Sequence, residues 1–251
     1  MIKFIAIAPL GLIIIVNFAT ILVKGQLPPD VKKCKYEDEQ CFIEQFNYVL
    51  SNKKNGDRSM NLVSLEPLEI TSISIQQPSG SVTIDLRFFN SKLHGLSEAR
   101  LFSAKGLHKD ITKPCEFRAK GDTIMLIGDY KIDGRVLFLP ISGGGAANMT
   151  IRDYEFKLKY DGTFVEKKGK KHGKVRKLVA DLKIGDLDID FENLFNGNKQ
   201  LSDNMNVFLN ENWREIWNEV KKSAIGAFES VFRTLIDNTF SKLPYDELFS
   251  E

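Results

Sequence analysis

The chain has 251 residues, of which 43% are hydrophobic and 27% charged, with a formal net charge of +2 at pH 7 and a pI near 8.3. A charge excess this small gives no reason to expect nucleic acid or an acidic partner across the whole surface. Roughly 225 residues follow an apolar N-terminal stretch, which is enough for one all-β or mixed domain with a sizeable core.

The N-terminus has the features of a secretory signal peptide. Lys3 precedes an apolar run that ends at Val23, and the small Val23 and Gly25 suit the positions before a cleavage site. We therefore predict a signal peptide over residues 1–25 and a secreted, extracellular chain over 26–251. Because the run is nearly long enough to span a bilayer, an uncleaved membrane anchor is the alternative. No later stretch is comparable, so no stable membrane insertion is expected after cleavage.

Two cysteines lie close together near the start of the predicted mature chain. Cys34 and Cys41 are seven residues apart, which in a secreted chain predicts a disulfide, with two free thiols as the alternative. Closing so short a loop would stabilise the fold by about 2–3 kcal/mol. Apolar residues at helical spacing follow from Cys41 to Leu50, which predicts a short amphipathic helix. Cys115 has no partner left and is expected to be buried as a small hydrophobic residue, with an intermolecular disulfide as the alternative.

The hydrophobic period becomes two between residues 68 and 191. Runs such as 82–88, 154–160 and 178–191 alternate apolar with polar side chains, which predicts antiparallel strands with one apolar face. Asp133-Gly134 and Asp161-Gly162 are predicted hairpin turns, and Gly143-Gly144-Gly145 a flexible turn.

The stretch from Asp203 to Phe240 returns to helical spacing. Its apolar residues recur in steps of three and four, with Ser202 and Asp203 as N-cap candidates and Pro244 beyond the end. One helix of that length would extend about 55 Å. Such a helix is either an ordinary core element or one that lies along an apolar tunnel. With the one-sided sheet it predicts an α+β fold, in which a long C-terminal helix is wrapped by a strongly curved antiparallel sheet, as a single domain over 26–251.

Catalytic and metal-binding patterns are weak. The three histidines, His94, His108 and His172, are far apart, and residues 95–99 lack the second glycine of a nucleophile elbow. Asp186, Asp188 and Asp190 alternate with apolar residues, as on the solvent face of a strand, and no calcium-loop pattern completes them. We expect no enzyme, no metal and no cofactor.

Two surface features remain. The basic run from Glu166 to Lys177 could touch anionic lipid or nucleic acid, but glycines interrupt it and no aromatic residue is interleaved, so a solvated hairpin loop is favoured. Asn148-Met149-Thr150 is the one N-glycosylation sequon, and its occupancy is open.

Several motifs in order resemble one protein family. They are KCKYEDEQC, SLEPLEITSISI from Ser64, DYKIDGRVLFLPISGGG from Asp129, FENLFNGNKQLSDNMNVFLNENWREIW from Phe191 and KLPYDELF from Lys242. This set, which covers about 27–249, is similar to the insect takeout and juvenile hormone binding protein family. The resemblance implies a secreted carrier whose sheet wraps a long helix around a tunnel for a lipophilic ligand. Cys34 and Cys41 match the family's N-terminal disulfide. The second disulfide of the hormone-carrying branch lacks its cysteines here, so the chain is closer to the takeout branch.

The favoured function is a non-enzymatic carrier of a small lipophilic ligand, of terpenoid or long-chain fatty-acyl type, acting as a monomer. From the pattern alone, bulky apolar residues on inward faces are expected to line the ligand site. They are Phe46, Leu50, Phe88, Phe138, Phe156, Trp217, Phe228 and Phe232. The alternative is a lipid-surface or protein-interaction module that acts through the basic loop at 166–177 and holds no internal ligand. A third function, a hydrolase, lacks a recognisable nucleophile and base.

Overall fold

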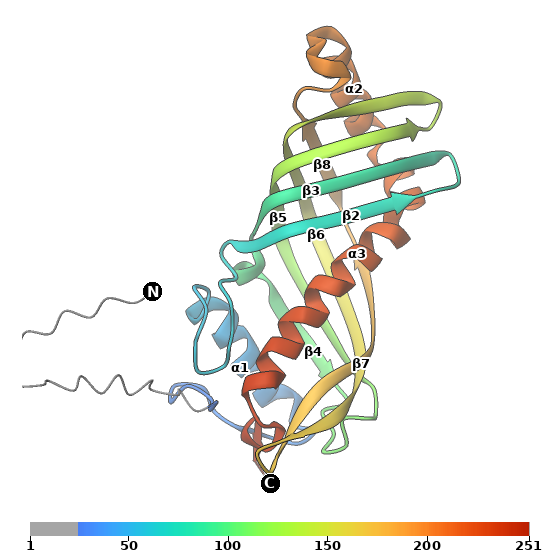
Figure 1. The fold of residues 1–251 in the computed structure, drawn as a ribbon. Coiled ribbons are helices and arrows are strands. Elements are labelled where there is room, and N and C mark those ends of the chain that lie inside the picture. The colour runs from blue at the N-terminus through green and yellow to red at the C-terminus, as the bar shows by residue number, and fades with distance from the viewer. Residues whose placement is uncertain (1–24, 251) are drawn as a thin grey trace, which may run out of the picture.

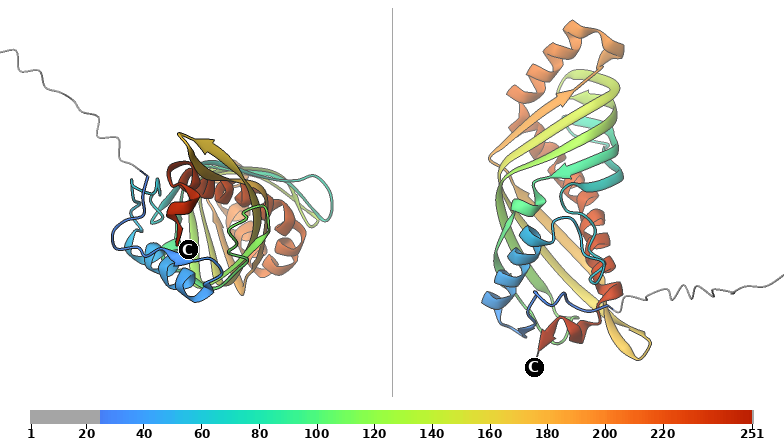
Figure 2. Two further views of the ribbon diagram at one scale, coloured as in Figure 1. Left: turned by 90° about the horizontal axis from the view of Figure 1, so that it is seen from below. Right: turned by 90° about the vertical axis from the view of Figure 1, so that its left-hand side faces the viewer.

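The computed structural model describes residues 25–250. The predicted signal peptide, and the anchor that is its alternative, lie outside that range except for Gly25. Figure 1 shows an elongated molecule in which a curved antiparallel sheet faces a long helix. The predicted α+β wrap is confirmed, and Figure 2 shows the strands curling around one side of the helix when the molecule is seen from below.

Seven strands form the sheet. They run in the order β2-β3-β5-β6-β7, with β4 paired to β5 and β8 paired to β6, and every pairing is antiparallel. Their bounds are β2 Leu68–Gln77, β3 Val82–His94, β4 Arg100–Lys105, β5 Cys115–Val136, β6 Leu139–Lys167, β7 Lys170–Lys183 and β8 Asp186–Phe191. Two short parallel strands, β1 (Cys34–Lys35) and β9 (Phe249–Ser250), join the two ends of the described chain.

The two longest strands divide the sheet into two halves. The end of β5 and the start of β6 pair with β3 and β8, whereas the start of β5 and the end of β6 pair with β4 and β7. We call the first part, with β2, the upper half and the second the lower half, as they stand in Figure 1.

The bend between the halves has local causes in both long strands. In β6, Asp153 adopts a left-handed φ of 50°, which interrupts the regular pleat. In β5, Gly121 lies opposite Tyr154, and a Cβ at this position would overlap the tyrosine ring. A glycine is therefore required for the ring to lie across the strand at the bend.

Three helices complete the fold: α1 (Glu39–Asn52), α2 (Lys199–Glu211) and α3 (Trp213–Lys242). The predicted single helix over 203–240 is thus two helices, because Asn212 leaves helical geometry (φ −108°, ψ 16°) and its amide donates to Phe208 O at 2.8 Å. The predicted N-cap is also wrong. Asn198 caps α2 by accepting from Leu201 N at 3.1 Å, and Ser202 is buried inside the helix.

The predicted turns are displaced. Asp133-Gly134 lies within β5, and the hairpin follows at residues 137–138. Asp161-Gly162 is a bulge inside β6 rather than a turn, and the chain reverses at 168–169 instead. The glycines at 143–145 pair with β5 as part of β6. In each case the strand continues because its partner offers a complete ladder of backbone hydrogen bonds, which outweighs the local turn preference.

Helix side chains satisfy the open edges of the sheet. Asn206 and Asn210 of α2 each exchange two hydrogen bonds with the backbone of β8, at Phe191 and Ile189, over 2.7–3.1 Å. The two asparagines are four residues apart, about one turn of the helix, and the two residues they bind are two apart on the strand. These two distances are nearly equal, so both asparagines reach the strand backbone at once. An edge strand is thereby closed to further pairing.

Side-chain hydrogen bonds to strand backbone also hold α1 and α3 against the lower half. Asn47 of α1 exchanges two hydrogen bonds with Leu101 of β4, at 2.8 and 2.9 Å. On α3, Asp237 accepts from Val175 N of β7 at 2.8 Å, and Glu229 accepts from Ala180 N at 2.7 Å. These polar contacts fix α1 and α3 as two walls on either side of the lower sheet. None of the helices within residues 25–250 is long and apolar enough to cross a membrane.

Candidate ligand-binding site

The interior of the lower half is lined by aromatic rings from four elements. Phe156 of β6 lies 4.7 Å from Phe232 of α3, ring centre to ring centre. Phe117 of β5 lies 5.8 Å from Tyr160 of β6 and 5.5 Å from Phe42 of α1. Alternation along β5 and β6 turns these residues to the same face, so the sheet and both helices contribute to one apolar lining.

These side chains are incompletely covered. No residue of α1 is buried, and on α3 the apolar side chains between Ala224 and Phe240 are all half-buried although they face the sheet. Half-buried apolar residues from the sheet and both helices pack against the buried residues of the lower half. They include Phe42, Ile43, Phe117, Ala119, Phe156, Tyr160, Ala180, Phe232 and Ile236. Large rings that point inward and keep accessible surface are candidates for contact with a bound apolar ligand.

The upper half is packed to completion. Phe88 has no exposed surface and contacts Phe191 at 6.4 Å between ring centres, and Leu194 is likewise fully buried. Trp217 and Phe228, on the adjoining part of α3, pack against this core while remaining half-buried.

The predicted lining residues therefore fall into separate places. Phe156 and Phe232 meet in the lower half, Trp217 and Phe228 stand at its upper end, and Phe88 lies within the upper core. Phe46 and Leu50 lie on α1, where Phe46 stacks on Phe42 at 5.9 Å and is 39% exposed.

Phe138 lies apart from the interior. It sits in the hairpin between β5 and β6, is 75% exposed, and meets Phe208 of α2 edge-on at 5.8 Å. Its position gives no support for a place in the lining.

Sequence reasoning missed several lining residues. Phe42, Phe117, Tyr160 and Ile236 belong to the same surface, together with Phe240 at the end of α3. The alternation of Phe117 and Ala119 with charged residues in the run from Cys115 was a usable signal, since it has the same period as the strands that were recognised.

Polar groups near this lining are held neutral. Cys115 is the one free cysteine among the described residues; it is buried, and its thiol donates to Tyr160 O at 3.4 Å. Burial raises the pKa of Cys115 to about 11 and holds the pKa of Tyr160 well above its ordinary value. Both groups stay protonated near pH 7, so Cys115 offers no reactive thiolate and Tyr160 presents an uncharged hydroxyl.

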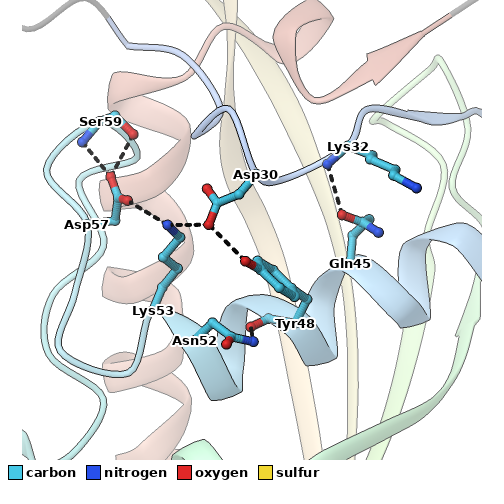
Figure 3. A network of polar contacts seen from close by, with 8 residues as sticks. All are labelled: Asp30, Lys32, Gln45, Tyr48, Asn52, Lys53, Asp57 and Ser59. Atoms are coloured by element: carbon cyan, nitrogen blue, oxygen red, sulfur yellow. Dashed lines mark hydrogen bonds and ion pairs between the residues drawn. The ribbon is translucent and has the colours of Figure 1, made fainter.

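Two fixed points hold α1 beside the sheet. The predicted disulfide is present: Cys34 and Cys41 are bonded, with their Cα atoms 5.7 Å apart, at the start of the helix. At the other end Lys53 contacts Asp30 at 2.7 Å, and the Tyr48 hydroxyl donates to the same carboxylate at 2.9 Å (Figure 3). These hydrogen bonds lower the pKa of Asp30, with Lys53 as the larger cause, so the N-terminal segment stays tied across the helix at neutral pH.

Residues 95–99, which lack the second glycine of a nucleophile elbow, lie beside the Glu66 carboxylate. The Ser97 hydroxyl donates to Glu66 at 3.2 Å, and His94 Nδ1 meets the other oxygen of that carboxylate at 2.9 Å. Ser97 and His94 thus contact the same carboxylate rather than each other, so they do not form the serine–histidine pair of a nucleophile elbow. Asp188 and Asp190 are exposed on β8 while Leu187 and Ile189 are buried, as the alternation predicted. Asn148 is exposed on β6, so the sequon lies in a strand rather than beside a turn.

Comparison with known proteins agrees with this geometry. The chain is 27% identical to the circadian clock-controlled protein daywake of Drosophila melanogaster and 26% to that of Drosophila yakuba, over 89% and 88% of this chain and 88% of each relative. The crystal structure of Takeout 1 from Epiphyas postvittana superposes with a TM-score of 0.75 at 26% identity, covering 88% of this chain and all of that one. The model of the haemolymph juvenile hormone binding protein family matches residues 12–250, which confirms the resemblance seen in the sequence. The chain belongs to the haemolymph juvenile hormone binding protein family.

Proposed function

We propose that this protein is a secreted, non-enzymatic carrier that holds a small lipophilic molecule in the lower half of its fold. The observation that carries the proposal is the row of inward-facing aromatic side chains that the protein leaves partly uncovered between α1, α3 and strands β4 to β7. Apolar side chains in this state gain free energy when an apolar ligand covers them. Membership of the family supports the same function.

The lining favours an elongated, uncharged or weakly polar ligand. Its side chains are hydrocarbon or aromatic, and the polar groups beside them, Cys115 and Tyr160, are neutral at pH 7. A terpenoid or a long-chain fatty-acyl compound fits this chemistry. Burial of about fifteen methylene equivalents at ~0.8 kcal/mol each gives roughly 12 kcal/mol before ordering costs. Those costs leave a dissociation constant in the micromolar to nanomolar range.

The direct test is a titration with a hydrophobic fluorescent probe, followed by displacement with fatty acids and terpenoids. A carrier binds the probe at a fixed stoichiometry and releases it to a lipid competitor, and native mass spectrometry of protein from its own source identifies the bound compound. A probe signal that does not saturate, or that no lipid displaces, would contradict the proposal.

A space-filling substitution places the ligand. Phe228→Trp adds volume to α3 at the upper end of the lining, and we expect at least tenfold weaker lipid binding with a loss of about 1–3 kcal/mol in stability. The matched control is Phe102→Trp, because Phe102 is 41% exposed on β4 and faces outward beneath Arg118 and Lys120. Unchanged affinity in Phe228→Trp would remove this residue from the lining.

A further inference from the structure

The positive charge of the chain is concentrated in one hairpin. Residues 155–183, which form the end of β6 and all of β7, contain ten lysine and arginine residues against four acidic ones, a net charge of +6. Because the whole chain carries +2, the remainder is net negative by four charges. An asymmetry of this size gives the molecule one strongly positive end.

The end of this hairpin projects from the body. Every residue from Thr163 to Lys171 is exposed, and Figures 1 and 2 show the tip extending beyond the C-terminal end of α3. The tip carries Lys167, Lys168, Lys170 and Lys171 against the single acid Glu166. Lys170 contacts Glu247 of the C-terminal segment at 3.3 Å. Lys167, Lys168 and Lys171 have no such acidic partner within the described part of the chain and give the tip its exposed positive charge.

Apolar side chains accompany the lysines. Phe164 and Val165 are each 37% exposed on the tip, and the ammonium of Lys171 lies 5.6 Å from the centre of the Phe164 ring. Phe164 also contacts Tyr245 edge-on at 5.3 Å, which anchors the hairpin to the C-terminal segment. Lysines around a partly exposed aromatic ring match the charged and interfacial layers of a phospholipid surface.

The charged surface continues along the outer face of the sheet. A groove of about 500 Å³ runs there, and its charged lining consists of three lysines, Lys157, Lys159 and Lys177, and two aspartates, Asp161 and Asp181. Pro114 and Val179 are among its apolar lining. Val179 is 50% exposed. The groove and the tip belong to the same two strands, so a flat anionic surface could meet both.

From these observations we infer that the β6–β7 hairpin docks the protein onto anionic phospholipid membranes. The inference goes beyond the proposed carrier function, since docking needs only the outer surface of the hairpin. If the carrier function holds, the hairpin places the end of the lower half against the membrane.

Vesicle sedimentation tests the docking. The probes are vesicles of phosphatidylcholine alone and of phosphatidylcholine with phosphatidylserine. The protein should partition at least tenfold more strongly to the anionic vesicles. That preference should fall as salt rises from 0.05 to 0.5 M, because the Debye length shrinks from above to below about 10 Å. Equal partition to both vesicles would overturn the inference.

A charge-matched pair of variants isolates the hairpin. One combines Lys167→Gln, Lys168→Gln, Lys170→Gln and Lys171→Gln. The other neutralises four exposed lysines elsewhere, Lys92, Lys131, Lys199 and Lys222. We expect at least tenfold weaker partition for the hairpin variant and less than a twofold change for the control. Equal losses would mean that net charge alone governs binding, which would overturn the assignment to the hairpin.

Two further readouts complete the test. Val165→Trp should show a blue shift of tryptophan emission with anionic vesicles if the tip enters the interface, and no shift would overturn the contact. Preference for heparin or polyuridylate over anionic vesicles at equal charge would assign the hairpin to another polyanion. The internal probe should bind the hairpin variant with unchanged affinity. If probe binding fails while docking holds, the carrier function falls and the docking inference stands.

Discussion

The two halves of this sheet are built from the same long strands and yet are packed differently. In the upper half, the side chains that strands β2, β3 and β8 turn inward are mostly buried, and Phe88 and Leu194 have no accessible surface. In the lower half, the facing rings of Phe117, Phe156 and Phe232 remain half-buried. A filled interior stabilises a fold, whereas an unfilled one forgoes contacts and leaves apolar surface for something else to cover. The fold thus separates the part that provides stability from the part that we propose holds the ligand.

The largest expected effect comes from two matched phenylalanines. Phe88→Ala should cost about 3–5 kcal/mol of unfolding free energy, because it opens a cavity in a filled core. Phe232→Ala should cost less than about 2 kcal/mol, because part of that ring already lacks protein neighbours. Urea unfolding of both variants measures the difference. Equal costs would show that the lower half is packed like the upper.

The same two variants separate stability from binding. Phe232→Ala should change the affinity for a lipid probe, since the ring lies in the proposed lining. Phe88→Ala should leave the affinity of the folded fraction unaltered. A binding defect in Phe88→Ala alone would place the ligand in the upper half.

The disulfide gives the next effect. Replacing both Cys34 and Cys41 with alanine should lower stability by about 2–3 kcal/mol, because the reduced chain regains the entropy that a short loop removes. Affinity for the probe should fall as well, since the bond fixes the start of α1, a wall of the proposed site. Lys35→Ala is the control, because Lys35 is exposed and lies next to the bonded Cys34 in the chain. Thermal unfolding and probe titration of both variants decide the outcome, and unchanged affinity would mean that α1 is held in place without the bond.

The asparagines that bind the sheet edges allow the two halves to be compared through the same kind of substitution. Asn206→Ala frees the backbone of β8 at Phe191, and Asn47→Ala frees that of β4 at Leu101. Each should cost about 1–3 kcal/mol, the penalty of a buried polar group without a partner. Only Asn47→Ala should also weaken probe binding, because only it holds a wall of the lower half. Asn148→Ala, on the exposed face of β6, should change neither stability nor affinity.

The sequence patterns predicted the curved sheet and the long helix, but not the difference in packing between the two halves of the sheet. The alternation over 82–88, 154–160 and 178–191 and the helical stripe after residue 203 identified the curved sheet and the helix, because these periods record which side faces the core. Nothing in those periods shows whether the core is filled. Phe88 and Phe156 look alike in the sequence, and only the neighbours that other strands bring decide that one is enclosed and the other is not.

The two misplaced turns share a physical cause, and two other errors do not. Asp133-Gly134 and Asp161-Gly162 have turn-forming residues, yet both lie inside long strands, since a neighbouring strand supplies the hydrogen bonds that a turn would have made locally. Asn212 divides the predicted helix although no proline or glycine marks the position. Phe138 was expected on an inward face because it is bulky and apolar, whereas it lies in the hairpin between β5 and β6.

The smallest effect should arise where the halves meet. Glu66 lies in the loop before β2 and binds the turn between β3, in the upper half, and β4, in the lower half. Its carboxylate accepts from Gly95 N at 2.9 Å and from the Ser97 hydroxyl at 3.2 Å, and it meets His94 at 2.9 Å. Burial raises the pKa of Glu66, but these three hydrogen bonds together lower it below the ordinary value of 4.5.

A carboxyl group whose pKa is lower in the folded than in the unfolded chain stabilises the fold at pH values above its unfolded pKa. That contribution is lost as the pH falls through the folded pKa. Glu66→Gln should therefore cost about 1 kcal/mol at pH 7, since an amide cannot accept all three hydrogen bonds with the strength of a charged acceptor. The cost should shrink as the pH drops below 4.5, where the wild-type carboxyl also becomes protonated. Urea midpoints at pH 7 and pH 3 measure the change, with Glu69→Gln on the exposed face of β2 as the control. A cost that is equal at both pH values would show that the charge of Glu66 does not tie the two halves together.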